Sequence, residues 1–255
     1  MGPVIELRDV SKAFVLQRNR VGDLKFRLLG RLHRQQSERR EPFWALRNLD
    51  LQVAAGEFLG LIGPNGSGKS TLLRIIAGIF RPTSGQVVVR GSVVPMIELG
   101  AGFHPELSGR ENVHLSTSLF GLSTREADGI LRAIVEFAGL ESFIDVPVKN
   151  YSTGMHARLG FAIAVHLDPD IVLVDEVLAV GDEAFQQKCI QRMEEMRRAG
   201  KTIVLVSHGL ESLQKLCDRA ALLVHGRLVE SGDPEAVIRR YRDILGMAGS
   251  VPATG

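Results

Sequence analysis

The stretch "LIGPNGSGKST", residues 61–71, decides the fold. It fits the pattern GxxxxGK[ST] in full, from Gly63 through Gly68 and Lys69 to Ser70. The apolar residues before it predict a strand, and "KSTLLRIIAGIF" after it changes to helical periodicity. Glycines let backbone N–H groups converge on an anion, and the start of a helix adds partial positive charge. The stretch therefore predicts a phosphate loop between a strand and a helix.

The expected ligand of this loop is a nucleoside triphosphate. We expect the ammonium of Lys69 to reach the β and γ phosphates, and the hydroxyl of Ser70 to face Mg²⁺. The residues expected to line the nucleotide are Gly63, Pro64, Asn65, Gly66, Ser67, Gly68, Lys69, Ser70 and Thr71. The guanine-reading pattern NKxD is absent from the sequence, which disfavours a GTPase.

The composition bounds the class of protein. The chain has 255 residues, 45% of them apolar and 24% charged, which is typical of a soluble protein of one or two domains. No apolar run approaches the roughly 20 residues that span a bilayer, and the N-terminus lacks the pattern of a signal peptide. The two cysteines, Cys189 and Cys217, are expected to be buried thiols in a reducing compartment.

Positive charge is concentrated in one segment. Residues 18–41 hold eight Lys/Arg against three acids, while the whole chain has a net charge of +2. Because the rest of the chain is then slightly acidic, a general nucleic-acid surface is not expected. Within the segment, Val21, Leu24, Leu28 and Leu32 fall on one helical face. This pattern favours an amphipathic helix that could attract anionic lipid headgroups, with a solvated basic loop as the alternative.

The pattern along the chain predicts an α/β fold with three parts. The runs "VIELRDV", "LDLQV", "EFLGLIG", "QVVVRG" and "SVVPMIEL" are interpreted as an antiparallel β layer. Residues from about 103 to 168 are interpreted as an inserted helical subdomain, with a capping box at Ser123 and Glu126. "IVLVDE" and "TIVLVSH" are expected to be buried parallel strands. "AALLVHGRLVESG" predicts a hairpin, "PEAVIRRYRDIL" a closing helix, and 246–255 a flexible tail after a domain covering 1–245.

The strand "IVLVDE" ends in the second half of the expected site. An acid at the end of an apolar strand fits the Walker B role, which assigns Asp175 to the Mg²⁺ shell. Glu176, the next residue, is then placed to orient or deprotonate the attacking water.

The segment "YSTGMHARLGFAIAVHLDPD" makes the resemblance specific: the chain resembles the ATP-binding subunit of an ABC transporter over roughly residues 4–240. Tyr151 to Met155 stand where the family has its LSGGQ signature; Ser152 and Gly154 are kept, and Thr153 replaces the first glycine. The resemblance assigns Asp182 to the D-loop and His208 to the switch histidine. It implies a mixed sheet with a phosphate-loop helix and two copies that sandwich two ATP molecules head to tail.

Two family positions differ or remain open. Phe14 stands at the position of the aromatic residue that stacks on adenine, with Phe43 and Trp44 as alternatives. The glutamine of the family's Q-loop is missing near Glu98 and Leu99. Glu98 is the candidate that could take over part of its contact with the metal.

The segments "IELGAGFHPELSGREN" and "DEVLAVGDEAFQ" resemble the branch of the family that exports lipid-linked cell-envelope polysaccharides. In that branch the segment matching residues 18–41 is called a gate helix. The resemblance implies a peripheral ATPase at the cytoplasmic face of the membrane, working with two copies of a separate multi-span permease. Alternatives are an exporter of small molecules or drugs, a soluble ABC protein that acts on ribosomes or DNA, and a plain phosphate-loop kinase.

Overall fold

A computed structural model describes residues 2–15, 42–97, 99–100, 102–175, 181–207 and 209–248. The basic segment 18–41 with its expected amphipathic helix, the acids Glu98 and Glu176, His208, and most of the expected tail lie outside the described residues.

A six-stranded sheet forms the centre of the fold, with the order β5-β6-β7-β3-β8-β9. Its bounds are β3 Phe58–Ile62, β5 Val93–Met96, β6 Ile171–Asp175, β7 Thr202–Val206, β8 Arg219–Val224 and β9 Arg227–Gly232. Only the β8–β9 pairing is antiparallel, and the other pairings between neighbours are parallel. The expected parallel strands and the expected hairpin, which turns at His225 and Gly226, are confirmed.

A smaller antiparallel sheet has the order β2-β1-β4, from β1 Ile5–Val15, β2 Pro42–Val53 and β4 Ser84–Val89. The interpretation of "EFLGLIG" and "SVVPMIEL" as members of this layer is wrong, because β3 and β5 pair in parallel within the six-stranded sheet. Both runs are short and apolar, and such a run does not reveal which sheet it joins.

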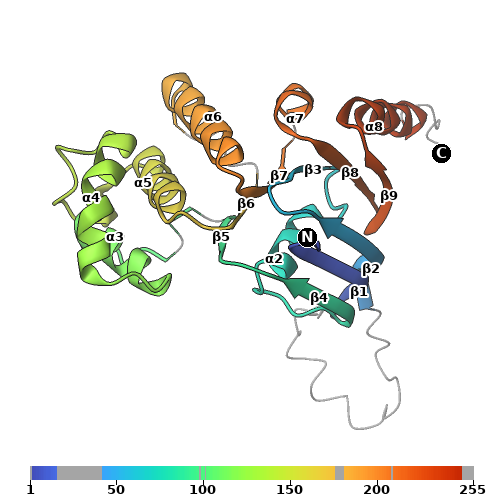
Figure 1. The fold of residues 1–255 in the computed structure, drawn as a ribbon, viewed down its shortest axis with the longest axis horizontal. Coiled ribbons are helices and arrows are strands. Elements are labelled where there is room, and N and C mark those ends of the chain that lie inside the picture. The colour runs from blue at the N-terminus through green and yellow to red at the C-terminus, as the bar shows by residue number, and fades with distance from the viewer. Residues whose placement is uncertain are drawn as a thin grey trace, which may run out of the picture.

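Helices cover the central sheet on both faces (Figure 1). α6 Glu183–Arg198, α7 Leu210–Leu216 and α8 Pro234–Ala248 lie on one face, while α2 Lys69–Ile76 and the small sheet lie on the other. Side chains alternate along a strand. Phe58 and Ile62 therefore enter the core beneath α6, α7 and α8, while Leu59 and Leu61 enter the core shared with α2 and the small sheet. α8 runs to Ala248, three residues into the range expected to be a flexible tail.

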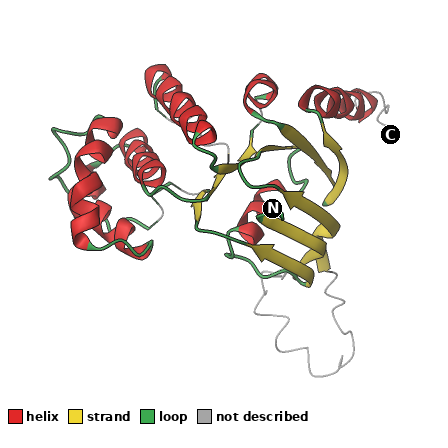
Figure 2. Ribbon diagram, in the orientation of Figure 1, coloured by secondary structure: helices red, strands yellow, loops and turns green. Residues whose placement is uncertain are grey.

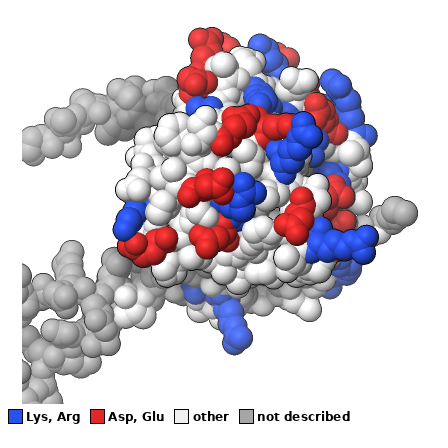
Figure 3. All heavy atoms as spheres, turned by 90° about the vertical axis from the view of Figure 1, so that its left-hand side faces the viewer, with Lys and Arg blue, Asp and Glu red and all other residues white. Residues whose placement is uncertain are grey.

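The helical subdomain stands at one side of the molecule (Figure 2). It contains α3 Gly109–Leu119, α4 Thr124–Ala138, the short η1 Val148–Asn150 and α5 Thr153–His166, around a core of its own. The expected capping box at Ser123 and Glu126 is present at the start of α4. On the outer face of this subdomain, acidic and basic side chains are interspersed (Figure 3), and several pair directly, as Arg110 does with Asp145.

Candidate functional site

The phosphate loop lies between β3 and α2, as expected. Lys69 is 6% exposed, and its Nζ donates to the carbonyl oxygens of Gly63 at 2.8 Å and Pro64 at 3.1 Å. Because these acceptors belong to the same loop, the lysine holds the loop closed around its own ammonium group. That arrangement keeps the charge beside the backbone that would receive a phosphate.

Two glycines of the loop are required by close packing. A Cβ on Gly63 would lie 2.0 Å from the carbonyl oxygen of Leu223, and a Cβ on Gly68 would lie 2.5 Å from that of Ala45. Gly68 also has φ +105°, which residues with a side chain rarely adopt. The loop therefore lies directly against β8 and β2, and only glycine fits at these two positions.

The start of α2 is suited to an anion. Gly68 is its N-cap and supplies no side-chain cap, so the amides of the first turn have no intrahelical partner. The buried hydroxyl of Ser67 has no hydrogen-bond partner among the residues that the structure describes. The Ser67 hydroxyl, a helix N-terminus and a lysine converge here, which is the chemistry that binds a polyphosphate.

Asp175 ends β6, two strands from the phosphate loop. Val206 of β7 pairs with Asp175 on one side and with Leu61 on the other, so the three residues form one row across the sheet. Strands are spaced by about 4.8 Å, which places Asp175 about 10 Å from the end of β3. The parallel strands thus deliver the phosphate loop and the expected metal carboxylate to one edge, where open α/β sheets bind ligands.

The oxygen donors at this edge fit a magnesium ion. Ser70 offers a hydroxyl from the first turn of α2, and Asp175 offers a carboxylate. Mg²⁺ prefers such ligands and is commonly bound by one or two protein oxygens together with phosphates. When bound, the ion would supply positive charge that offsets the negative charge of the phosphates.

The signature turn lies on the helical subdomain, away from the chain's own phosphate loop (Figure 1). Ser152 is the N-cap of α5, and its Oγ accepts from the amide of Met155 at 3.2 Å. A Cβ on Gly154 would meet only Ser152 Oγ, at 3.8 Å, and Thr153 between them is exposed. The first turn of α5 is therefore an open helix N-terminus.

Asp182 is engaged within its own chain. It caps α6 by accepting from the amide of Phe185 at 2.8 Å, and its second oxygen lies 3.9 Å from Arg158 of α5. The resemblance assigned Asp182 to the D-loop, and no sequence pattern pointed to Arg158. The position of Arg158, three residues after the signature and on the same helix, was the available signal.

Phe14 lies near the open end of the small sheet. It stands opposite Phe43 in the β1–β2 ladder, and its ring meets Phe80 edge to face at 5.6 Å. Lys12 Nζ lies 5.1 Å from the Phe14 ring. Trp44 pairs with Ala13, so it points to the opposite face of the sheet from Phe14. Phe14 and Phe43 thus share one face, to which the structure adds Phe80.

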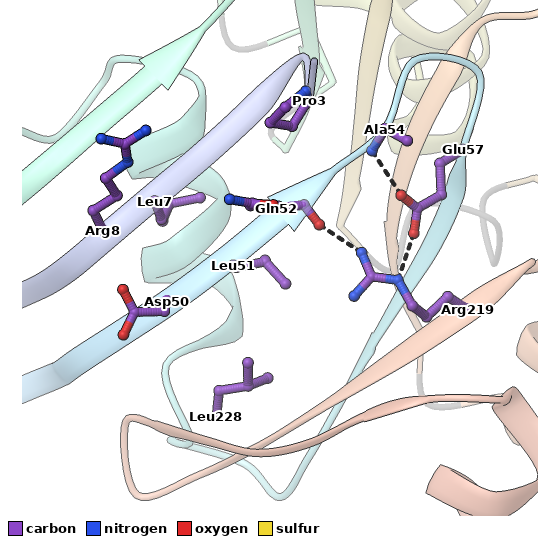
Figure 4. A pocket seen from close by; sticks show the side chains of 10 residues that line it. All are labelled: Pro3, Leu7, Arg8, Asp50, Leu51, Gln52, Ala54, Glu57, Arg219 and Leu228. Carbon is purple, nitrogen blue, oxygen red and sulfur yellow. Dashed lines mark hydrogen bonds and ion pairs between the residues drawn. The ribbon is translucent and has the colours of Figure 1, made fainter. Parts of the chain in front are cut away.

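A separate hollow lies elsewhere on the molecule. A cavity of about 580 Å³ has Leu7, Leu51 and Leu228 in its floor, and it opens beside Glu57 at the start of β3 (Figure 4). Arg219 in its wall already bonds to Glu57 and to the carbonyl of Gln52. This cavity is at the opposite end of β3 from the phosphate loop, and two of its charged wall groups, Glu57 and Arg219, pair with each other.

The two cysteines are buried free thiols, as expected. Burial raises the pKa of both Cys189 and Cys217 to about 12, so neither thiol is a nucleophile near neutral pH.

The fold and the loop together define a phosphate-loop nucleotide-binding protein with an inserted helical subdomain. Comparison with known proteins narrows the class: residues 46–179 match the family model described as ABC transporter. The chain belongs to the ABC transporter family, and it is an ATPase of the ATP-binding cassette type.

Relatives cover the chain almost completely. It is 41% identical over 245 residues to the O-antigen export system ATP-binding protein RfbB of Klebsiella pneumoniae, covering 96% of this chain and 100% of the relative. It is 50% identical over 201 residues to the teichoic acids export ATP-binding protein TagH of Levilactobacillus brevis, covering 79% of this chain and 55% of the relative.

A solved structure supports the fold. The dimeric post-hydrolysis structure of the ATP-binding cassette MJ0796, bound to ADP and Pi, matches with a TM-score of 0.73 at 24% identity. The match covers 90% of this chain and 98% of that one.

Proposed function

We propose that this chain powers the export of a lipid-linked cell-envelope polysaccharide, of the O-antigen, teichoic acid, capsule or galactan type. The observation that carries the proposal is the similarity to RfbB over the whole of that relative, supported by the similarity to TagH. Both relatives are named as ATP-binding proteins of polymer export systems. An exporter of small molecules is the second candidate, and the basic segment 18–41 together with the missing Q-loop glutamine argues against it.

The pore would come from another polypeptide. Among the described residues, no helix combines the length and apolar character that crossing a bilayer requires. From the resemblance to the polysaccharide-exporting branch, we infer that the chain works as a pair, at the cytoplasmic face of the membrane, with two copies of a multi-span permease. Copurification of a permease from detergent-solubilised membranes tests this arrangement. ATPase activity stimulated by lipid-linked glycans but not by drugs would separate the two candidate substrates.

Each ATP would lie between two copies arranged head to tail. One copy would supply the phosphate loop with Lys69 and Ser70, and its partner would supply the exposed first turn of α5, with Ser152 and Gly154. Support comes from the position of that turn, which faces away from its own loop, and from the dimeric form of MJ0796. The open amides of this turn suit the terminal phosphate.

A few side chains would each have a separate role in ATP hydrolysis. Lys69 would hold charge on the β and γ phosphates, and Asp175 with Ser70 would hold Mg²⁺. Glu176 would orient the attacking water and accept its proton, while His208 would contact the γ phosphate. Loss of the γ phosphate would remove the bridge between the copies and let them separate.

Two variants test these roles. Glu176→Gln should bind ATP with near-normal affinity and hydrolyse it at least 100-fold more slowly, because the amide cannot accept the proton. Lys69→Ala should lose ATP affinity by tenfold or more, because a charge-assisted contact is removed. Calorimetric titration and phosphate release measure the two quantities. Wild-type turnover in Glu176→Gln, or wild-type affinity in Lys69→Ala, would contradict the assignments.

A further inference from the structure

Arg158 of α5 contacts two other elements, α4 and α6. Its Nε donates to the carbonyl oxygen of Ala138 at 3.0 Å, at the end of α4. Its guanidinium lies 5.3 Å from the ring centre of Phe185 and 3.9 Å from the carboxylate of Asp182, both in the first turn of α6. One side chain therefore joins the helical subdomain to the helix that follows the catalytic strand β6.

The environment of Arg158 is built for a guanidinium. Ala138 is in the last turn of α4, where carbonyl oxygens lack helical partners and attract a cation. Gly139 follows it with φ +63°, and a Cβ there would lie 2.9 Å from the guanidinium. The planar group thus passes over a glycine, stacks on an aromatic ring and still reaches a carboxylate. Lysine cannot make all of these contacts at once.

Ser152, which starts the helix that carries Arg158, and Asp182, which Arg158 contacts, belong to the edge that would meet the second copy. Ser152 lies six positions before Arg158, or about 9 Å along the axis of α5. Asp182 caps α6 directly after the segment that contains Glu176. We propose that Arg158 is a positioning residue for ATP hydrolysis, which holds Ser152 and Asp182 in one fixed relation so that both engage the partner copy together. This inference rests on the proposed head-to-tail pairing.

Two other cations fasten α6 further from that edge, and they provide the control. Lys188 donates to the carbonyls of Glu136 and Phe137 at 3.3 and 3.1 Å, and Arg192 donates to that of Val165 at 3.0 Å. These contacts attach the last turn of α4, which Arg158 also reaches, and the last turn of α5 to α6 without touching Asp182. Lys188→Ala therefore weakens the same interface between subdomains while leaving the contact between Arg158 and Asp182 in place.

The experiment measures ATP-driven dimerisation in the Glu176→Gln background, where the ATP-bound pair would accumulate. Sedimentation velocity over a range of protein concentrations gives the dimer Kd. We expect Arg158→Ala to raise this Kd about tenfold, Arg158→Lys about threefold, and Lys188→Ala less than twofold. In the chain that retains Glu176, Arg158→Ala should lower kcat about tenfold with little change in ATP affinity at the phosphate loop.

A double-mutant cycle decides whether Arg158 acts through Asp182. Asp182→Asn keeps a good helix cap but removes the charge that attracts the guanidinium. If Arg158 positions Asp182, the double variant should be no weaker than the poorer single variant. Fully additive losses, or equal weakening by Lys188→Ala, would overturn the inference. Thermal melts identify any variant that fails to fold, and Arg158→Lys then carries the comparison.

The outcomes also separate this inference from the proposed function. If the Glu176→Gln protein dimerises with ATP and Arg158→Ala does not change its Kd, the positioning role fails and the ATP-driven pairing stands. If the Glu176→Gln protein remains monomeric in saturating ATP, the head-to-tail pairing fails, and the role of Arg158 fails with it.

Discussion

Replacing Gly68 by alanine should destabilise the protein even without nucleotide. An alanine at φ +105° costs about 1–2 kcal/mol in backbone strain. The new Cβ would also lie 2.5 Å from the carbonyl oxygen of Ala45 and 2.8 Å from the Leu46 side chain. Relieving an overlap with backbone costs about 1–3 kcal/mol more, so we expect a total near 3 kcal/mol.

Gly66 in the same loop provides the matched control. It has φ +75°, but a Cβ there would have no neighbour within 4 Å. Gly66→Ala should therefore cost only the strain, about 1 kcal/mol. In a chain of this size each kcal/mol lowers Tm by about 2–4 °C, which gives about 6–12 °C for Gly68→Ala and about 2–4 °C for Gly66→Ala.

Circular dichroism melts in nucleotide-free buffer with EDTA measure both variants without any contribution from ligand binding. The reasoning fails if the two variants melt within 2 °C of each other, since the packing of the loop against β2 would then be immaterial.

The remaining predictions concern buried groups. Asn112 is fully buried, and its side chain bonds to the backbone of His104, Leu107 and Ser108, so Asn112→Ala should cost about 2–3 kcal/mol, measured by urea unfolding. A loss of unfolding free energy below 0.5 kcal/mol would show that the loop 104–108 keeps its conformation without the hydrogen bonds of Asn112. Burial raises the pKa of Cys189 and Cys217 from 9.0 to about 12, so the folded chain retains protons that the unfolded chain releases, and stability should fall as pH rises from about 9 towards 12. Both thiols should resist a maleimide at pH 7.5 until urea is added, and rapid labelling of the folded protein would contradict their burial.

Local patterns predicted those parts of the fold that depend on neighbouring residues. The capping box at Ser123, the hairpin at His225–Gly226 and the buried strands β6 and β7 are all confirmed. The same capping pattern at Ser108 and Glu111 starts α3, and it was readable in the sequence but not used.

The errors concern partners that are distant in sequence. β3 and β5 were assigned to the wrong sheet because apolar runs of five and four residues carry no information on their pairing. In the site, the glycine pattern located the loop, and the strand "IVLVDE" located Asp175. The contacts of Arg158, and the packing of Phe80 on Phe14, join segments far apart in the chain, so only the folded structure reveals them.

The anchoring of Gly226 has a consequence for nucleotide entry. Its N–H donates to the carbonyl of Ser67 in the phosphate loop, and its own carbonyl accepts from Arg47 of β2. The tip of the β8–β9 hairpin thus connects the phosphate loop to the small sheet by main-chain hydrogen bonds. Position 226 must be glycine, because a Cβ there would lie 2.6 Å from the carbonyl oxygen of Ala45. A loop held in this way is preorganised: the amides of the loop already have the orientation that a triphosphate would require. Binding would then lose little conformational entropy of the loop.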